Sequence, residues 1–374
     1  MENIKNNFVL ENFIKENYSH KTANTHDICQ ILPVITNNKM KFNISNNIGS
    51  IVIDGMTPEL ILNPILVFEL DENNGNNGNN ENNGYNDELD IDSIISNIYL
   101  EIGGSTIFKL WDQQIKIYNK IYKLESKKIG SKIFYPVPIL QMINGNGLLF
   151  SKCKYHEIRL FVNYNANHFL KYIKHCYMTC DLIYVYENPN YSLLTNYTFT
   201  NFKNNNQCRN NLNNFNKLNE IYQNSILLKI NENQFTGLEF VDQNSSTLRT
   251  RLNFNHNVNR FFIYFQNQDD KSIYWNTQQF EKIQFFALGE TVLEYDYQTL
   301  LDLNDKNILG YELPNGVFEI KWNCAQWKNL SNLDNLTIVI SKLMIPLNFG
   351  FAICAESENL ACYKGNAYWL FFAN

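Results

Sequence analysis

Apolar residues in this chain gather in short runs that are separated by Asn, Gly and Pro. Within many runs, such as 154–165 and 177–190, apolar and polar positions alternate, which is the period of a strand with one buried face. Short strands at regular spacing, with turn residues between them, are typical of β-sandwiches and jelly rolls. The segments that predict strands are 39–56, 59–71, 94–110, 132–150, 154–165, 177–190, 225–230, 237–242, 260–266, 283–296, 316–322, 335–345 and 349–356.

One segment has a helical period instead. In residues 113–128 the apolar side chains of Ile117, Ile121 and Leu124 follow an i, i+4, i+7 spacing, and two tyrosines flank that stripe. The spacing predicts a helix in a connection between strands.

Three polar segments divide the chain. Residues 1–40 are mixed and polar, which predicts an N-terminal arm. Residues 71–87 have almost no apolar side chain, so we expect an exposed, flexible loop that is dispensable for folding. Residues 200–220 are rich in Asn and predict a linker. The fold predicted on either side of this linker is all-β, with about eight short strands in each half.

We therefore expect two tandem eight-stranded antiparallel jelly rolls, with short helices in the loops. The first roll is predicted over residues 41–199 and the second over 221–374. No residue-level repeat relates the halves, so any duplication is architectural.

Composition narrows the possible functions. The chain has 374 residues, of which 44% are hydrophobic and 14% aromatic, so large cores can form. The net charge is −6 and no dense stripe of Lys or Arg occurs, which argues against direct nucleic-acid binding. We expect no signal peptide and no transmembrane segment, since no run of about eighteen apolar residues is present. The eight cysteines lack framework spacing, which predicts reduced thiols.

Candidate chemistry is sparse. His256 lies in "LNFNHNVNRFF" at a predicted bend, without a partner at fixed spacing. We interpret it as a turn residue whose imidazole bonds to nearby backbone, with Asn255 adopting the unusual backbone angles.

Two other groups of side chains contain residue types that can bind metals or catalyse reactions. In His168, His175, Cys176 and Cys180 the adjacent His175 and Cys176 would point to opposite faces of a strand, which favours buried thiols over a zinc site. The acids Glu157, Glu290, Glu294 and Asp296 are explained by exposed strand positions better than by glycoside hydrolysis. The Gly103–Gly104 pair is predicted to form a turn, since no phosphate-loop context follows it. We predict no catalytic residue, metal or cofactor.

Six segments, in order along the chain, resemble the double jelly-roll major capsid proteins of large double-stranded DNA viruses. They include "IYLEIGGSTIFKL" (98–110), "FYPVPILQMINGNGLLFSKCKYHEIRLFVNY" (134–164) and "DLIYVYENPN" (181–190). The others are the segment around Asn255 and His256, "LPNGVFEIKWNCAQWKNLSNLDNLTIVI" (313–340) and the aromatic tail. The motif residues that carry the resemblance are Glu101, Gly103, Gly104, Tyr155, His156, Asn255, His256 and Asp334.

The resemblance implies a structural virion protein and not an enzyme. Three copies would form a pseudo-hexagonal capsomer, and capsomers would tile an icosahedral-type shell. Implied partners are neighbouring capsomers and minor capsid proteins, with contact to an internal membrane only through other proteins. The implied location is the virion capsid, and the host cytoplasm during assembly.

Three alternatives stay open. The Pro that follows Asn-His in the family is Asn257 here, which leaves room for a divergent minor capsid or scaffold paralogue. A carbohydrate-binding β-sandwich would present an exposed aromatic platform, and a jelly-roll hydrolase would bring acids together.

Overall fold

The computed structural model describes most of the predicted strands and the connections between many of them. The described residues are 33–41, 43–45, 48–53, 60–70, 94–142, 156–165, 173–185, 226–240, 246–275, 278–324, 328–333, 335–346, 348–364 and 367–370. The predicted loop at 71–87 and the predicted linker at 200–220 lie outside them.

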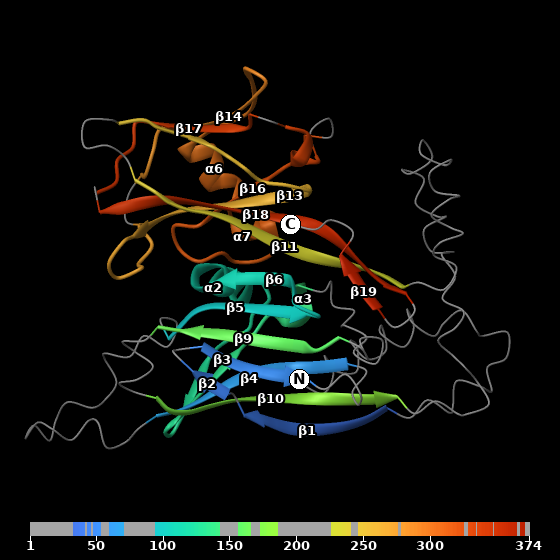
Figure 1. Ribbon diagram of the computed structural model, residues 1–374. Helices are drawn as coiled ribbons and strands as arrows, with labels where there is room; N and C mark the ends of the chain where they lie inside the picture. Colours follow the sequence, from blue (N-terminus) through green and yellow to red (C-terminus); the bar gives the residue numbers. More distant parts are fainter. Residues whose placement is uncertain are drawn as a thin grey trace, which may run out of the picture.

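Two antiparallel sheets form the first half of the fold (Figure 1). One sheet has the order β1-β10-β4-β8-β7, with bounds Pro33–Lys41, Ile173–Val185, Leu60–Leu70, Lys132–Pro136 and Lys127–Ile129. The other has the order β2-β3-β9-β5-β6, with bounds Asn43–Ser45, Ile48–Ile53, Ile158–Tyr164, Ile95–Ile102 and Ser105–Trp111.

Two further antiparallel sheets form the second half. One has the order β11-β18-β13-β16, with bounds Ile226–Glu239, Phe349–Lys364, Asn257–Asn267 and Phe318–Lys321, and β19 (Ala367–Leu370) pairs with β18. The other has the order β12-β17-β14-β15, with bounds Leu248–Arg251, Thr337–Ser341, Lys282–Ala287 and Glu290–Asp296.

The two halves share one strand order. If the short strands β2 and β7 are left out, the first half contains eight strands, which pair in the orders 1-8-3-6 and 2-7-4-5. The strands β11 to β18 pair in the same two orders. This arrangement of two four-stranded sheets is a jelly roll. The prediction of two tandem eight-stranded jelly rolls is therefore confirmed, and the halves are called the first and second roll below.

Short helices lie in the connections, as predicted. They are α2 (Asp112–Ile121), α3 (Ile139–Met142), α6 (Tyr297–Leu303), α7 (Lys306–Leu309) and the 3-10 helix η9 (Leu330–Asn332). Helix α2 lies where the spacing of Ile117 and Ile121 predicted a helix. Both side chains are buried.

The structure corrects several of the predicted elements, and part of the strand predicted at 132–150 forms α3 instead. Strand β1 begins at Pro33 and pairs with β10, so the predicted arm of residues 1–40 ends too late. A polar sequence forms a strand there because β10 supplies its backbone hydrogen bonds. The two runs predicted at 225–230 and 237–242 form one strand, β11, which continues through a bulge between Phe235 and Leu238. The sequence pattern does not predict β12, because its sequence "LRTR" contains one large apolar residue and so shows no clear alternation of apolar and polar positions.

Strand β13 is buried on both faces. Phe261, Ile263 and Phe265 belong to the core inside the second roll. Phe262 and Tyr264, which alternate with them, belong to a core that extends into the first roll. The rolls therefore lie against each other through an apolar junction, in which α2 and β6 face the sheet of β11, β18 and β13 (Figure 1).

Candidate functional site: the corners and the junction of the two rolls

The motif residues of the first roll meet at one corner. Glu101, Gly103 and Gly104 lie at the turn from β5 to β6, and His156 lies just before β9. Because Ile102 pairs with Ile158, the two motif segments become neighbours. The Gly103 N–H donates to the Glu157 carbonyl at 2.9 Å. Tyr155 lies outside the described residues.

Gly103 is required at this corner for two reasons. Its φ is +59°, which residues with a side chain rarely adopt. A Cβ atom there would also lie 2.4 Å from His156 Nδ1. Gly104 has a φ of +82° but no atom within 4 Å of such a Cβ. The two glycines of this turn are therefore not equivalent.

The structure corrects the interpretation of His256. His256 itself has the positive φ, +65°, and Asn255 is not among the described residues with this conformation. Its Nδ1 lies 2.8 Å from Oε2 of Glu232 on β11, so the ring contacts a buried carboxylate. This partner lies 24 residues away in the sequence, so a local turn pattern does not contain it.

Residues that are far away in the sequence also bond to the backbone around His256. The His256 N–H donates to Ser331 Oγ at 2.9 Å, and its carbonyl accepts from the Leu330 N–H at 2.9 Å. The side chain of Gln234 bonds to both the N–H and the carbonyl of Asn255. The bend thus joins β11, β13 and η9. Asp334, the other motif residue near η9, lies outside the described residues.

Three of the four acid candidates have local partners, and the fourth, Glu290, is exposed at the start of β15. Glu157 pairs with Arg159 and Glu294 with Lys282, both on the surface. Asp296 caps α6 by accepting from the Thr299 N–H at 2.8 Å. The bonds from Thr299 lower the pKa of the Asp296 carboxyl. These acids do not converge on one cleft.

The metal-ligand candidates on β10 differ in burial, and the thiols of Cys176 and Cys180 both lie in the core of the first roll. His175 is exposed and Cys176 is buried, as the strand alternation predicted, while His168 lies outside the described residues. Burial raises the pKa of the Cys176 thiol to about 12. Among the described residues, no group of three or more His, Cys, Asp or Glu side chains is placed to hold a metal ion. In the same part of the chain, no helix combines the length and the apolar character needed to cross a membrane.

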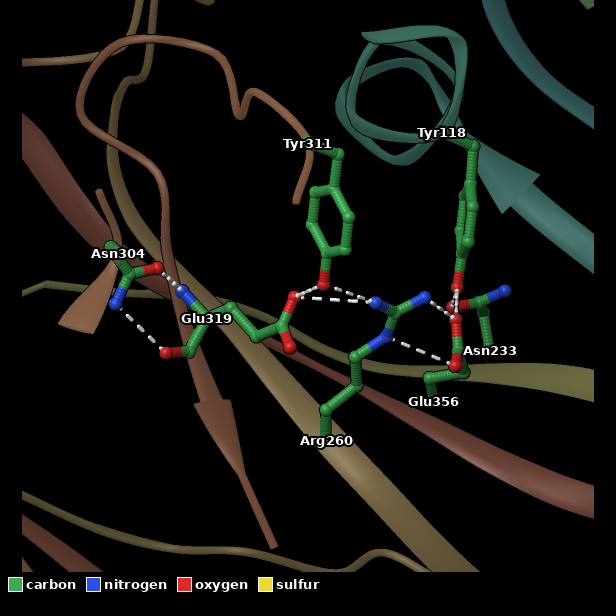
Figure 2. Close-up of polar contacts among 7 residues, drawn as sticks. All are labelled: Tyr118, Asn233, Arg260, Asn304, Tyr311, Glu319 and Glu356. Atoms are coloured by element: carbon green, nitrogen blue, oxygen red, sulfur yellow. Dashed lines mark hydrogen bonds and ion pairs between the residues drawn. The ribbon is translucent and has the colours of Figure 1, made fainter. Parts of the chain in front are cut away.

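A buried polar network lies at the junction between the rolls (Figure 2). Arg260 on β13 forms a two-pronged contact with Glu356 on β18, with Nε 3.0 Å from Oε1 and Nη2 2.8 Å from Oε2. Its Nη1 lies 3.2 Å from Oε2 of Glu319 on β16. Arg260 therefore bridges two carboxylates from the two strands that flank its own.

Two tyrosines complete the network. Tyr118 on α2 of the first roll donates its hydroxyl to Glu356, and Asn233 Oδ1 lies 2.9 Å from the same hydroxyl. Tyr311 donates to Glu319 and accepts from Arg260 Nη1 at 2.8 Å. The contacts of Tyr118 with Glu356 and Asn233 cross between the rolls.

Asn304, after α6, fixes the strand that carries Glu319. Its side chain accepts from the Glu319 N–H at 2.6 Å and donates to the Glu319 carbonyl at 3.0 Å (Figure 2). Asn304 thereby holds the edge strand β16 to the loop that follows α6.

Electrostatics keep Tyr118 and Arg260 in one protonation state. Burial raises the pKa of the Tyr118 hydroxyl well above its ordinary value, and the Glu356 carboxylate raises it further. Burial alone would lower the pKa of the Arg260 guanidinium, but Glu356 and then Glu319 leave it raised. Tyr118 therefore remains a donor and Arg260 a cation at any physiological pH.

The network opens to solvent through a pocket of about 530 Å³. Its lining is Asn259, Arg260, Tyr311, Glu319, Lys321, Trp322, Asn323, Cys324, Lys328 and Glu356. Cations and carboxylates both line it, so its charge selects no single class of ligand.

The apolar and polar pattern does not predict this network, although the sequence contains a signal for it. Arg260, Glu319 and Glu356 each interrupt an apolar run: "NRFFIYF", "VFEIKW" and "AICAESE". A charge on a strand that is buried on both faces needs a partner, because an isolated buried charge is very costly. Which charges pair follows from the strand order, which the sequence pattern does not give.

Two rolls of the same order, joined by a buried junction, define a double jelly-roll protein. VP54 of the virus PBCV-1, a crystal structure fitted into a reconstruction of the virophage Sputnik, matches this chain with a TM-score of 0.63. It has 15% sequence identity, and the match covers 92% of this chain and 98% of VP54.

Two more solved structures are similar. A quasi-atomic model of the PBCV-1 capsid matches with a TM-score of 0.62 at 14% identity, over 92% of this chain and 98% of the other. The Faustovirus major capsid protein matches with a TM-score of 0.51 at 9% identity, over 96% and 98%. No family model and no curated protein matches the sequence. The resemblance to double jelly-roll capsid proteins is confirmed in the fold.

Replacing Gly103 with Ala should destabilise the protein more than replacing Gly104 with Ala. Both changes place a side chain at positive φ, at a cost of about 1–2 kcal/mol. Only Gly103→Ala also collides with His156, which adds about 1–3 kcal/mol. Urea unfolding measures both, and Gly103→Ala combined with His156→Ala should lose this collision term. Equal losses for the two glycines would contradict the proposed role of His156.

Arg260→Leu should lower the free energy of unfolding by about 3–5 kcal/mol, because Glu319 and Glu356 would stay buried without their cation. Lys282→Leu is the matched control, since it removes a strand cation from the exposed carboxylate of Glu294 and should leave the urea midpoint nearly unchanged. Adding Glu319→Gln and Glu356→Gln to Arg260→Leu should restore part of the loss. If Arg260→Leu behaved like the control, the network would contribute nothing to the junction.

The thiols of Cys176 and Cys354 should resist iodoacetamide in the native protein. Burial raises the pKa of each to about 12, so at about pH 8 almost no thiolate is present to react. After unfolding in urea without reductant, all eight cysteines should be labelled. Mass spectrometry of the labelled peptides reads both states. A recovered disulfide-linked peptide pair would reject the prediction of reduced cysteines.

Proposed function

We propose that the chain is a structural protein of a viral capsid. The observation that carries the proposal is the duplication of one strand order in two rolls, which are locked together by a buried junction. A rigid pair of rolls is suited to assembly, because the contacts on one side of the molecule keep a fixed geometry relative to the contacts on its other side. The match to VP54 over nearly both whole chains supports this function.

The proposed assembly is a homotrimer. Three copies would arrange six rolls around one axis, so that a three-fold symmetric particle has a pseudo-hexagonal outline. Such capsomers can tile a shell with icosahedral-type symmetry, because each one presents six similar sides to its neighbours.

The proposed units are the two rolls themselves. We place the first roll from Pro33 to about residue 199 and the second over 221–374, with 200–220 as the linker between them. The motif residues Glu101, Gly103, Gly104, Tyr155, His156, Asn255, His256 and Asp334 are proposed to shape corners of these rolls and not to catalyse a reaction. For His256, the ties to Glu232, Ser331 and Leu330 support a structural role.

The proposed partners are those of a protein that forms a capsid shell. They are neighbouring capsomers and minor capsid proteins, with no direct contact to nucleic acid. Contact with an internal membrane would pass through other proteins. The proposed location is the virion capsid, and the host cytoplasm during assembly.

Light scattering coupled to size-exclusion chromatography tests the trimer directly. The expected mass at micromolar concentration is three times the 43.9 kDa of one chain. Negative-stain images of the same fraction should show hexagonal outlines. A mass of one chain over a wide dilution range would contradict the capsomer. A glycan array on that monomer would then test the carbohydrate-binding alternative.

A further inference from the structure

One outward face distinguishes the first roll from the second. It belongs to β3, β9, β5 and β6, which lie side by side in that order (Figure 1). On β9 the side chains of Leu160 and Val162 point into the core, and on β5 those of Ile98 and Leu100 do the same. The residues that alternate with them along each strand therefore point outward.

An aromatic pair lies at the centre of this face. Phe161 on β9 and Tyr99 on β5 are paired directly, and their rings stack with centroids 4.6 Å apart and planes 7° apart. Ile48 and Val52 on β3 lie diagonally beside Phe161 and are 40% and 49% exposed. These four side chains form one contiguous apolar patch, which is accessible in a single copy of the chain.

A charged pair lies in the next row of the same face. Arg159 on β9 is paired directly with Glu101 on β5, and the two are called the charged pair below. The Arg159 side chain is exposed and that of Glu101 is partly exposed. Glu157 also contacts Arg159, and Lys109 lies in the row of the aromatic pair. The face thus carries two cations and two acids, so two copies of it have no net charge that would keep them apart.

The second roll carries different residues at the equivalent positions. Its sheet β12-β17-β14-β15 has the same strand order, and its turn from β14 to β15 corresponds to the turn from β5 to β6. Counting from these turns, Gln284 and Val339 occupy the positions of the aromatic pair, and Phe286 and Thr337 those of the charged pair. The jelly-roll fold itself therefore does not require either pair on the first roll.

A two-fold axis makes this face complementary to itself. If the axis runs along the strands, midway between β9 and β5, then β9 of one copy faces β5 of the other. Phe161 then faces Tyr99 of the second copy, and Arg159 faces Glu101 of the second copy. Each contact occurs twice, as in any contact between identical surfaces about a two-fold axis. Sheets that pack face to face keep their strands within about 30° of each other, which this axis allows.

We propose that the outward face of β3, β9, β5 and β6 binds the same face of a second copy of this chain, about a two-fold axis parallel to the strands. The contact has aromatic side chains at its centre and polar groups around them, which is the makeup of a protein interface. A trimer contains three first rolls, so the contact would join one capsomer to its neighbours. The inference rests on the proposed capsomer and assigns a surface through which capsomers meet.

Reversing either charge of the charged pair tests the contact. Glu101→Arg places cations opposite cations across the two-fold axis, and Arg159→Glu places acids opposite acids. Each variant alone should remain a trimer. The concentration at which half of the trimers associate should rise about a hundred-fold or more, because like charges that face each other across an interface strongly oppose binding.

Mixing trimers of the two variants tests the two-fold arrangement itself. In a contact between them, two arginines on one face meet two glutamates on the other. An equimolar mixture should therefore associate at nearly the wild-type concentration, although neither variant does so alone. Light scattering measures the result, because one trimer has three times the mass of the 43.9 kDa chain and associated trimers have multiples of that mass.

Thr337→Glu is the matched control. Thr337 has the position of Arg159 on the second roll, so the same new charge there should leave the association of trimers unchanged. Urea unfolding of each variant checks the fold, which charge changes at exposed positions affect little.

The outcomes separate the contact from the proposed function. A wild-type chain that stays monomeric would contradict the capsomer, and the contact with it. Wild-type trimers that do not associate, or charge variants that associate alone as the wild type does, would overturn the contact and leave the capsomer intact. Variants that fail alone and also fail when mixed would overturn the two-fold arrangement.

Discussion

The sheet of β11, β18, β13 and β16 is buried on both of its faces, and the rest of the molecule depends on this. One face closes the core of the second roll through Phe261, Ile263 and Phe265. The other forms the junction with α2 of the first roll. Burial on both faces removes the usual freedom to place polar side chains on the solvent side of a strand. A buried polar atom on the junction face, away from the pocket beside Arg260, must find its partner inside the protein.

In the network around Arg260, the buried polar groups are partners for one another. One guanidinium serves Glu356 and Glu319, and two tyrosine hydroxyls supply the further donors. A buried ion pair of this kind contributes little net stability relative to a well-packed apolar junction. The network instead fixes geometry, because the Tyr118 hydroxyl contacts Glu356 at one position of α2 along the sheet. The two rolls are thereby fixed in one relative position.

Much of the fold follows from local pattern, and the parts that do not have identifiable causes. The spacing of Ile117 and Ile121 predicts α2, and the Gly103–Gly104 pair predicts the turn between β5 and β6. The spacing of apolar residues does not predict helices α6 and α7, because only Leu300 is buried in them. Their capping residues, Asp296 and Asp305, are the local signal that could have revealed them.

The candidate site was less predictable than the fold. Glu232 lies on β11 and His256 at the bend before β13, and Tyr118 and Glu356 lie 238 residues apart. Pairing over such separations depends on strand order and on the docking of one roll against the other. Neither is encoded in a window of neighbouring residues. A motif resemblance marks the position of His256 but does not identify its partner.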